Sequence, residues 1–476
     1  MTSTIPRIYF ETLEEALPAP ERVAQVRDEL LAAGVEYVLS CWIDLLGVPK
    51  TKPVPISQFE NLCLGKGPQF AVHSVSMVPE LGPADADQIA LPDLDSVIIC
   101  PWDRRYAWVF ADLFWQGEPY YACPRQLLKR QMQLAADKGY TFMSGMEPEF
   151  MVLRRTGDTF EKAFGHDTVK VGDEAIQRQP YGYDVGHSID SAHFLEAVTK
   201  HLKDLDWNLT NVVCEGAYSQ FELDYGFFDV LTTADRFTFL RVLLQEVAKE
   251  QGLFVTYMPK PTNGDWRNGA HINLSVRPVG ETDNLFENEE GTWSELAYQA
   301  VAGLLSHGAA LTCVTCPTVN SYAGLTGSVA GLEGGTLTWA PTHITYGNNN
   351  RSAMIRLPQT RIAVENRAVD MTVNAYSAMA LTTAAALEGM EKKLDPGPPV
   401  NKPLYSLSAA EADEVGARRL PSNLLDAVRA FEADELAKEV FGPKMHAMYT
   451  LYKNVEWARF HEHVTDWEQR EYLRFF

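Results

Sequence analysis

Polar residues at i and i+2 spacing, carboxylates among them, stand out in the apolar parts of the sequence. In "MEPEF", Glu147 and Glu149 are separated by one proline, and Met, Phe, Val and Leu residues surround them. A β-strand would place both side chains on one face. Burying a carboxylate costs several kcal/mol unless a positive charge lies beside it. The spacing therefore raises the question of what compensates these two glutamates.

Other apolar stretches repeat this spacing. The further polar sets are Gln220 and Glu222 in "SQFEL", His271, Asn273 and Ser275 in "HINLS", and Glu365 and Arg367 in "VENRA". A solvated sheet face would also alternate polar with apolar residues, but the combined set is rich in Glu and His and poor in Lys and Thr. If one sheet carries all these strands, its carboxylates, with Glu215 added, repel one another in a common cavity. We expect two divalent cations, Mg²⁺ or Mn²⁺, to balance them.

An arginine-rich stretch, "YGNNNRSAMIRLPQTRIAVENR", contributes Arg351, Arg356, Arg361 and Arg367. Apolar residues are interleaved with these arginines, so a purely solvated basic stretch is the weaker explanation. Paired metals beside an arginine cluster are typical of a site for a polyphosphate and a transferring phosphoryl group. Because "LGKGPQF" lacks the spacing of a P-loop, we expect the sheet itself to hold the nucleotide.

The elements that must position these residues follow from periodicity. Residues 22–33 have helical spacing that ends at Gly34, and "VEYVLSCWIDLLGVPK" predicts two strands joined by a turn. The β-rich segments "LDSVIICPW" and "YAWVFADLFW" precede a helix that ends at Gly139. We predict an α+β fold with a small sheet-and-helix domain over residues 1–116 and a catalytic domain over residues 117–476.

Composition restricts the partners. The chain has 476 residues, of which 46% are apolar and 22% charged, as in soluble proteins of two or more domains. A net charge of −22 argues against nucleic acid or an anionic membrane surface as a partner. Seven cysteines, an odd number, and an N-terminus without a signal-peptide pattern favour reduced thiols and a cytoplasmic protein. We interpret Cys313 and Cys316 as core thiols instead of zinc ligands.

From about residue 24 to the C-terminus the chain resembles the glutamine synthetase family. The motifs that carry the resemblance include "DLLGVPK", "MEPEF", "EGAYSQFEL", "YMPKP", "NGAHINLS", "CPTVNSY" and "TWAPTHITYGNNNRSAMIR". The last motif is similar to the branch that ligates glutamate to amines other than ammonia. The resemblance implies an N-terminal β-grasp domain, a catalytic domain on a curved antiparallel sheet, and a homo-oligomeric double ring with active sites between subunits.

The resemblance also implies ATP and two to three Mg²⁺ or Mn²⁺ ions as cofactors. The implied metal ligands are Glu149, Glu215 and Glu222 for one ion, and Glu147, His271 and Glu365 for another. The implied nucleotide and phosphate contacts are Ser275, Phe227, Arg351, Arg356 and Arg361. The spacing from Arg361 to Glu365 is longer than usual in the family.

The implied substrates are glutamate, ATP and an amine. ATP would phosphorylate the side-chain carboxylate, and the amine would then displace phosphate. The implied glutamate-binding residues are Gly269, His271 and Arg367. The implied catalytic residues are Arg351, Arg367 and Glu333, the last as the glutamate of a flap.

The sequence departs from the family pattern near the expected substrates. "NSYAGL" stands where family members usually read "NSYKRL", so Gly324 replaces the arginine that clamps the α-carboxylate of glutamate. Losing that partner is costly unless another cation substitutes. The Gly-rich segment "TGSVAGLEGGT" that follows is longer than usual, and we expect a mobile flap there.

Ala71 replaces the aspartate that binds ammonium in glutamine synthetases, and Val213 and Cys214 replace paired histidines. An apolar replacement favours an organic amine, alkyl or aromatic, as the acceptor. The alternatives are a glutamine synthetase that uses ammonia, a ligase for another carboxylic acid, and a catalytically silent scaffold. Tyr405 falls where some bacterial relatives are adenylylated, although a packed loop tyrosine explains it equally well.

Overall fold

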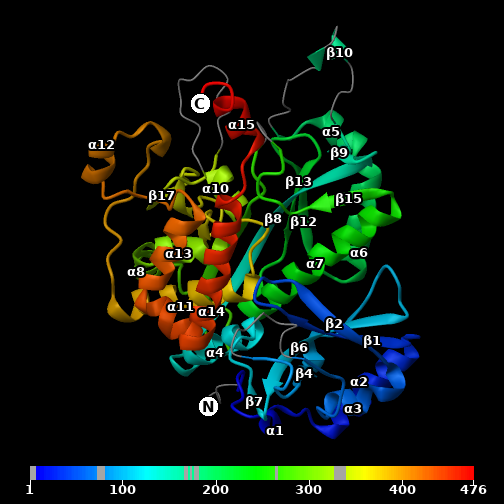
Figure 1. Ribbon diagram of the computed structural model, residues 1–476. Helices are drawn as coiled ribbons and strands as arrows, with labels where there is room; N and C mark the ends of the chain where they lie inside the picture. The colour runs from blue at the N-terminus through cyan, green and yellow to red at the C-terminus, as the bar shows by residue number, and fades with distance from the viewer. Residues whose placement is uncertain are drawn as a thin grey trace.

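The computed structural model describes residues 7–71, 81–165, 170–171, 174–175, 182–262, 266–325 and 339–476. The chain forms two main sheets, and in Figure 1 the sheet that contains β1 and β6 lies below the sheet that contains β8 and β13. Within the described residues, no helix combines the length and apolar character needed to cross a membrane. The predicted flap and Glu333 lie outside the described residues.

The N-terminal sheet has the strand order β2-β1-β6-β4-β3, with β5 and β7 also paired to β6. The strands are β1 (Tyr37–Ile43), β2 (Pro49–Pro55), β3 (Gln69–Phe70), β4 (Gln88–Pro92), β5 (Ile98–Ile99), β6 (Tyr106–Trp115) and β7 (Glu118–Pro119). The helices of this region are α1 (Leu13–Ala16), α2 (Pro20–Ala32), η1 (Ile56–Gln58), α3 (Phe59–Cys63) and η3 (Leu94–Ser96). The predicted strand–turn–strand segment is confirmed as the β1–β2 hairpin, and β1 also pairs in parallel with β6.

Helix α2 covers this sheet through Val23, Val26 and Leu30, which share one buried cluster with Val38 and Val109 of the sheet. The helix stops because the chain turns at Gly34, where φ is +83° and glycine alone is unstrained. The predicted helix over 22–33 is thereby confirmed. Strand β7 extends the N-terminal sheet slightly past residue 116, and the domain boundary there stays a prediction.

The catalytic sheet has the strand order β12-β13-β8-β16-β19-β18-β17-β20, with β9, β14 and β15 also paired to β8. Its strands are β8 (Tyr140–Thr156), β9 (Thr159–Lys162), β12 (Leu209–Cys214), β13 (Gln220–Tyr225), β14 (Phe228–Asp229), β15 (Leu253–Thr256), β16 (Ala270–Pro278), β17 (His343–Asn348), β18 (Ala353–Leu357), β19 (Val364–Asn366) and β20 (Arg418–Arg419). A separate two-stranded pair joins β10 (Lys170–Val171) to β11 (Glu174–Ala175). The expected antiparallel sheet is confirmed except at β17 and β18, which run parallel.

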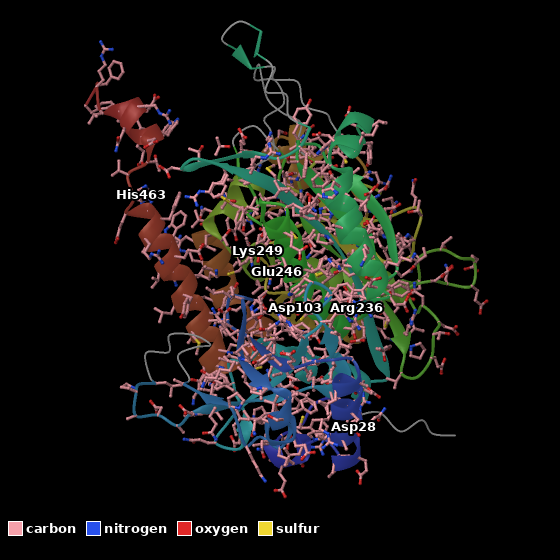
Figure 2. The ribbon with its side chains drawn as sticks, turned by 90° about the vertical axis from the view of Figure 1, so that its right-hand side faces the viewer. Asp28, Asp103, Arg236, Glu246, Lys249 and His463 are labelled. Atoms are coloured by element: carbon pink, nitrogen blue, oxygen red, sulfur yellow. The ribbon has the colours of Figure 1, made fainter. Side chains whose placement is uncertain are left out.

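This part of the chain contains helices that pack directly on the sheet and helices that lie further out (Figure 1). They are α4 (Pro124–Asp137), α5 (Val185–Asp190), α6 (Ala192–Asp204), α7 (Val230–Glu250), α8 (Glu295–Ser306), α9 (Gly308–Thr315), α10 (Val319–Leu325), α11 (Ala375–Lys392), η4 (Leu404–Ser406), α12 (Ala409–Glu414), α13 (Leu424–Ala433), α14 (Glu435–His461) and α15 (Asp466–Tyr472). Helices α8 and α11 approach so closely that a Cβ at Gly303 would lie 2.0 Å from the carbonyl oxygen of Ala385. Figure 2 shows α15 standing away from the body of the molecule, beyond His463.

A buried ion network joins the N-terminal sheet to the catalytic helices. The Arg125 guanidinium on α4 contacts Asp93 and Asp112 of the N-terminal sheet region at 2.8 Å each, and Asp235 of α7 at 2.9 Å. Lys129, one turn further along α4, contacts Asp93 and Asp112 as well. The side chain of Arg125 is 1% exposed, so this charge depends entirely on its three carboxylate partners.

Candidate active site

The polar sets of the sequence converge on adjacent strands of the catalytic sheet. Glu149 of β8 lies directly opposite Glu222 of β13, and Glu147 lies opposite His271 of β16. On the next strand, Glu365 of β19 lies opposite Asn273. The prediction that one sheet carries these strands is confirmed. The strand register, with its period of two, keeps the acidic and imidazole side chains on one face.

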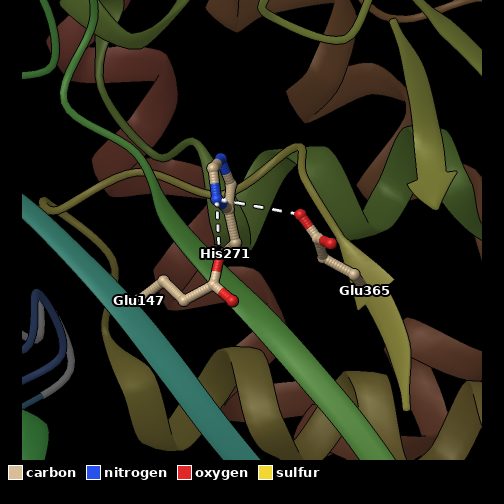
Figure 3. Close-up of side chains that lie close together, drawn as sticks. All are labelled: Glu147, His271 and Glu365. Atoms are coloured by element: carbon tan, nitrogen blue, oxygen red, sulfur yellow. Dashed lines mark hydrogen bonds and ion pairs between the residues drawn. The ribbon is translucent and has the colours of Figure 1, made fainter. Parts of the chain in front are cut away.

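His271 stands at the centre of this face (Figure 3). Its Nδ1 lies 3.2 Å from Oε2 of Glu147 and 3.9 Å from Oε1 of Glu365. Its Nε2 lies 3.7 Å from Oε1 of Glu149. Burial, helped by the charge of Arg367, lowers the pKa of His271 to about 4. The imidazole is therefore neutral at pH 7, which is the form that binds metal ions.

Two groups of potential ligand atoms share His271. Glu147, His271 and Glu365 form one, and Glu149, Glu222 and His271 form the other; within each group the atoms lie within 4.8 Å of one another. The first group matches a predicted ligand set. In the second, His271 stands where the resemblance implied Glu215, although Glu215 lies near enough to raise the pKa of both Glu149 and Glu222.

Arginines neutralise the half of the site that contains Glu147 and Glu365. Glu365 accepts from Nη1 of Arg356 at 2.7 Å and from Nη1 of Arg367 at 2.5 Å. Glu147 accepts from Nη2 of Arg361 at 2.6 Å. Burial alone would raise the pKa of Glu147, but hydrogen bonding to His271 and the charge of Arg361 lower it to about 2. Burial would also raise the pKa of Glu365, but Arg367, His271 and Arg356 together lower it.

The other half lacks such partners. The ion pairs formed by the described residues leave Glu149, Glu215 and Glu222 without an arginine. Burial, reinforced by Glu215, raises the pKa of Glu149 to about 8. Burial and the charge of Glu149 raise the pKa of Glu222 well above its ordinary value. Burial also raises the pKa of Glu215. Arginines therefore compensate Glu147 and Glu365, whereas Glu149, Glu215 and Glu222 have no such partner among the described residues.

Gly269 occupies a position that no side chain could fill. A Cβ there would lie 2.8 Å from Oε1 of Glu149 and 2.9 Å from Nε2 of His271. Its backbone N–H donates to Oε2 of Glu149 at 2.8 Å. Gln220, which the sequence placed in the polar set, is buried and donates from Nε2 to the Arg267 carbonyl at 2.7 Å and to Asn268 at 2.9 Å. Gln220 therefore supports the loop that carries Gly269.

The remaining predicted contacts to nucleotide and phosphate lie in two separate parts of the sheet region. Phe227 is exposed, and the Arg277 guanidinium lies 5.3 Å from the centre of its ring. Ser275 precedes Arg277 by two residues on β16 and so shares its face. Arg351 lies 5.4 Å from the ring centre of Trp339, and its carbonyl accepts from Nε of Arg367 at 3.2 Å. Arg351 thus adjoins the arginine-rich half of the site.

Several residues of this site escaped the sequence reasoning. Asn349 accepts from Nε and Nη2 of Arg356 at 3.0 and 2.7 Å, and so fixes its guanidinium. Asn273 was placed in a polar set by the sequence but given no role; it accepts from Nη2 of Arg361 at 2.8 Å and donates to Glu147 at 3.0 Å. Arg277 continues the i, i+2 spacing of β16, which could have identified it. No local pattern indicates the contact between Trp339 and Arg351.

Comparison with known proteins matches residues 121–472 to the glutamine synthetase catalytic domain. The chain belongs to the glutamine synthetase family. A glutamate–methylamine ligase of Methyloversatilis universalis is 38% identical over 448 residues, which cover 93% of this chain and 97% of the relative. A glutamine synthetase of Rhizobium leguminosarum bv. phaseoli is 34% identical, covering 91% and 96%. A solved GmaS–ADP complex is 35% identical with a TM-score of 0.83, covering 94% of this chain and 99% of that structure.

These findings confirm the predicted family, its glutamate–amine ligase branch and the α+β catalytic fold. As a member of the glutamine synthetase family, the protein is a carbon–nitrogen ligase. The chain covers nearly the full length of the relatives it matches.

The positions that depart from the family pattern also have defined surroundings. Ala71 is exposed. Cys214 is buried, and its Sγ lies 3.2 Å from Oγ of Ser188. The hydroxyl of Tyr405 donates to the Ala340 carbonyl at 2.9 Å. Cys313 and Cys316 are free and buried, which confirms their interpretation as core thiols.

Proposed function

We propose that this member of the glutamine synthetase family joins the γ-carboxylate of L-glutamate to an organic amine at the expense of ATP. The observation that carries the proposal is the combination of two acidic–imidazole groups with Arg356, Arg361 and Arg367 on one sheet face. The similarity to a glutamate–methylamine ligase supports the choice of an amine as the acceptor.

The donor set fits divalent metal ions. Carboxylate oxygens and a neutral imidazole suit Mg²⁺ or Mn²⁺, and the raised pKa of Glu149, about 8, marks a place where positive charge is missing. Glu149, Glu215 and Glu222 would hold one ion, and Glu147, His271 and Glu365 another, in a site for two to three ions. When bound, these ions would neutralise charge on the ATP phosphates.

The arginines of the chain supply the rest of the positive charge. Arg356 is held by Asn349 and Glu365, so its guanidinium is oriented before substrate binds. Arg351 and Arg356 would contact phosphate oxygens, while Arg367, with Gly269 and His271, would face glutamate. Phe227 and Ser275 would contact the nucleotide, together with Arg361. Preorganised guanidinium groups stabilise the charge that develops on a transferring phosphoryl group.

The chemistry proceeds in two balanced steps. An oxygen of the γ-carboxylate attacks the γ-phosphorus of ATP, the bond to the bridging oxygen breaks, and ADP leaves. The amine nitrogen then attacks the carbonyl carbon of the γ-glutamyl phosphate, and inorganic phosphate leaves as the amide forms. The amine gives up its proton in this second step, and we propose Glu333 as the group that assists there.

An organic amine suits the acceptor positions better than ammonia does. Ala71 offers an exposed methyl group where a carboxylate would attract ammonium. Cys214 directs its sulfur to Ser188, so it offers no charge to a cation. Burial of an alkyl or aryl substituent against apolar side chains would favour an organic amine by about 0.8 kcal/mol for each buried CH₂ group.

We further propose a cytoplasmic homo-oligomer arranged as a double ring. Exposed apolar side chains occur just before, within and beyond α15, namely Val464, Trp467, Tyr472, Leu473, Phe475 and Phe476. Such exposed apolar side chains are typical of a subunit contact. Seven free, buried cysteines agree with a reducing compartment.

Mass spectrometry of reactions with L-glutamate, ATP, Mg²⁺ and a panel of amines tests the function. The panel comprises ammonium, methylamine, isopropylamine, ethanolamine and aniline. A γ-glutamyl amide of an organic amine, formed with stoichiometric ADP, supports the proposal. A clear preference for ammonium would instead identify a glutamine synthetase, and the absence of any ATP turnover would identify a silent scaffold.

A further inference from the structure

Arg267 and Gly324 occupy one space between them. Gly324 lies in α10, and a Cβ built on it would lie 2.9 Å from Cβ and 3.4 Å from Cδ of Arg267. The Arg267 side chain therefore passes directly over the backbone of Gly324. A side chain at position 324 could project there only if Arg267 moved away. The glycine in "NSYAGL" is thus the residue that makes room for Arg267.

The Arg267 guanidinium is buried but only partly satisfied. The residue is 8% exposed, and its Nη2 donates to the Val369 carbonyl. Among the described residues, Nη1 is buried without any hydrogen-bond partner. A buried charged donor without a partner is unfavourable, so the arrangement indicates a group that awaits an acceptor.

The surroundings of Arg267 connect it to the active site. Two residues further along, Gly269 donates its N–H to Glu149, and the Arg267 carbonyl is fixed by Gln220. On the other side, the Trp266 ring lies 5.9 Å from the ring of Trp339, whose carbonyl accepts from Nη2 of Arg367. Arg267 therefore lies between two segments that carry proposed glutamate-binding residues, Gly269 and Arg367.

We infer that Arg267 binds the α-carboxylate of the amino-acid substrate, in place of the arginine that family members usually carry at the position of Gly324. The inference rests on the proposed function and deepens it, because it names the residue that recognises the α-carboxylate of glutamate. One guanidinium has been exchanged for another that reaches the same space from the loop before β16. A fork of two N–H groups suits a carboxylate, and Nη1 supplies a free one.

A structural role is the competing explanation. Asp370 is buried near Arg267, and its Oδ2 has no hydrogen-bond partner among the described residues. If Arg267 only balances the charge of this carboxylate, its removal would lower the stability of the protein and weaken the binding of every ligand alike. If Arg267 binds substrate, its removal would weaken the binding only of ligands that carry an α-carboxylate.

Calorimetric binding of L-glutamate and of 4-aminobutyrate, which lacks the α-carboxylate, separates these roles. We expect the wild-type protein to bind glutamate at least about tenfold more tightly than 4-aminobutyrate. Arg267→Ala should weaken the binding of glutamate about 10- to 100-fold and leave the binding of 4-aminobutyrate unchanged. Gly324→Ala keeps Arg267 but crowds it, and it should shift the preference in the same direction. Arg267→Lys, which keeps the charge, covers the case in which the alanine variant does not fold.

The double variant Arg267→Gly/Gly324→Arg returns the guanidinium to the usual family position and should recover glutamate selectivity. The inference is overturned by equal loss of both ligands in the Arg267 variants, by unchanged glutamate binding, or by a folded double variant that stays as weak as Arg267→Ala. ADP formation with the amine panel is measured separately. A protein that selects glutamate through Arg267 but forms no amide would refute the proposed function and leave this inference standing.

Discussion

Glu149 and Glu222 face each other across two adjacent antiparallel strands, β8 and β13, with no arginine of the described residues paired to either. Like charges placed directly opposite destabilise a sheet, and burial aggravates the effect. Two strands away, Glu365 is held by two arginines. We therefore expect the β8–β13 side to be the half of the site that depends on an added cation.

Replacing Glu222 by glutamine tests this dependence. In EDTA at pH 8, Glu222→Gln should raise Tm by about 2–4 °C, because burial and Glu149 raise the pKa of Glu222, which costs stability at this pH, whereas an amide does not titrate. Mg²⁺ should raise the Tm of the wild type but not of the variant. Turnover should fall at least about 100-fold. Glu281→Gln in an exposed turn serves as the control, and full activity of the wild type in excess EDTA would contradict the metal requirement.

The reaction products test the acyl-phosphate route. ATP should be converted to ADP and phosphate in a one-to-one ratio with the amide. Methionine sulfoximine should become phosphorylated in the site and inhibit, since it mimics the adduct of amine and γ-glutamyl phosphate. Quantification by phosphorus NMR checks both points, and the appearance of AMP with pyrophosphate would refute the route.

Position 71 should control the choice of acceptor. We expect kcat/KM for an organic amine to exceed that for ammonium at least about tenfold, since each buried CH₂ contributes about 0.8 kcal/mol. Ala71→Asp should narrow this ratio by crowding the amine and attracting a cation. Ala19→Asp, which adds the same charge at the exposed N-cap of α2, is the matched control. A ratio that both variants leave unchanged would exclude Ala71 from the acceptor site.

Removing Arg125 should uncouple the two sheets. Arg125→Met leaves Asp93, Asp112 and Asp235 without their shared partner, and we expect a loss of about 3–5 kcal/mol in the free energy of unfolding. Urea unfolding followed by tryptophan fluorescence measures the change. Lys200→Met breaks an exposed pair with Asp204 and should cost no more than about 0.5 kcal/mol. Equal effects of the two variants would contradict a structural role for the buried network.

His307 predicts a pH dependence away from the active site. Its Nδ1 lies 2.7 Å from Asp434 and its Nε2 2.9 Å from Glu388. Burial opposes the charge on His307, but these two hydrogen-bonded carboxylates raise its pKa. His307 therefore stabilises the fold fully below about pH 6.5, its unfolded value, and this stabilisation is lost as pH rises through the raised pKa.

The stability contributed by Asp434 and Glu388, the two carboxylates that contact His307, depends on pH in the opposite direction. Burial would raise the pKa values of Asp434 and Glu388, but hydrogen bonds from His307 lower both, so their contributions fade as pH falls through those lowered values. His307→Gln should consequently reduce Tm more at pH 6 than at pH 9. Differential scanning calorimetry, with exposed His193→Gln as the control, measures the difference. If the Tm difference between His307→Gln and the wild type were the same at both pH values, the role of His307 in stability would be refuted.

Local pattern was sufficient to find the catalytic strands. The i, i+2 spacing of Glu147 with Glu149, and of His271 with Asn273, depends only on strand geometry, and apolar flanks reveal that the strands are buried. Helix α2 and the β1–β2 hairpin were predictable for the same reason, because short-range periodicity and glycine turns specify them.

Tertiary structure decided how the charges are distributed among these strands. The order β13-β8-β16-β19-β18 brings Arg356 and Arg367 to Glu365 and leaves Glu149 and Glu222 facing each other. The same packing lays Arg267 over Gly324, 57 positions away in the chain. Electrostatic energy depends on distance and burial in space, and residues remote in sequence set both, so no reading of local spacing could have assigned these partners.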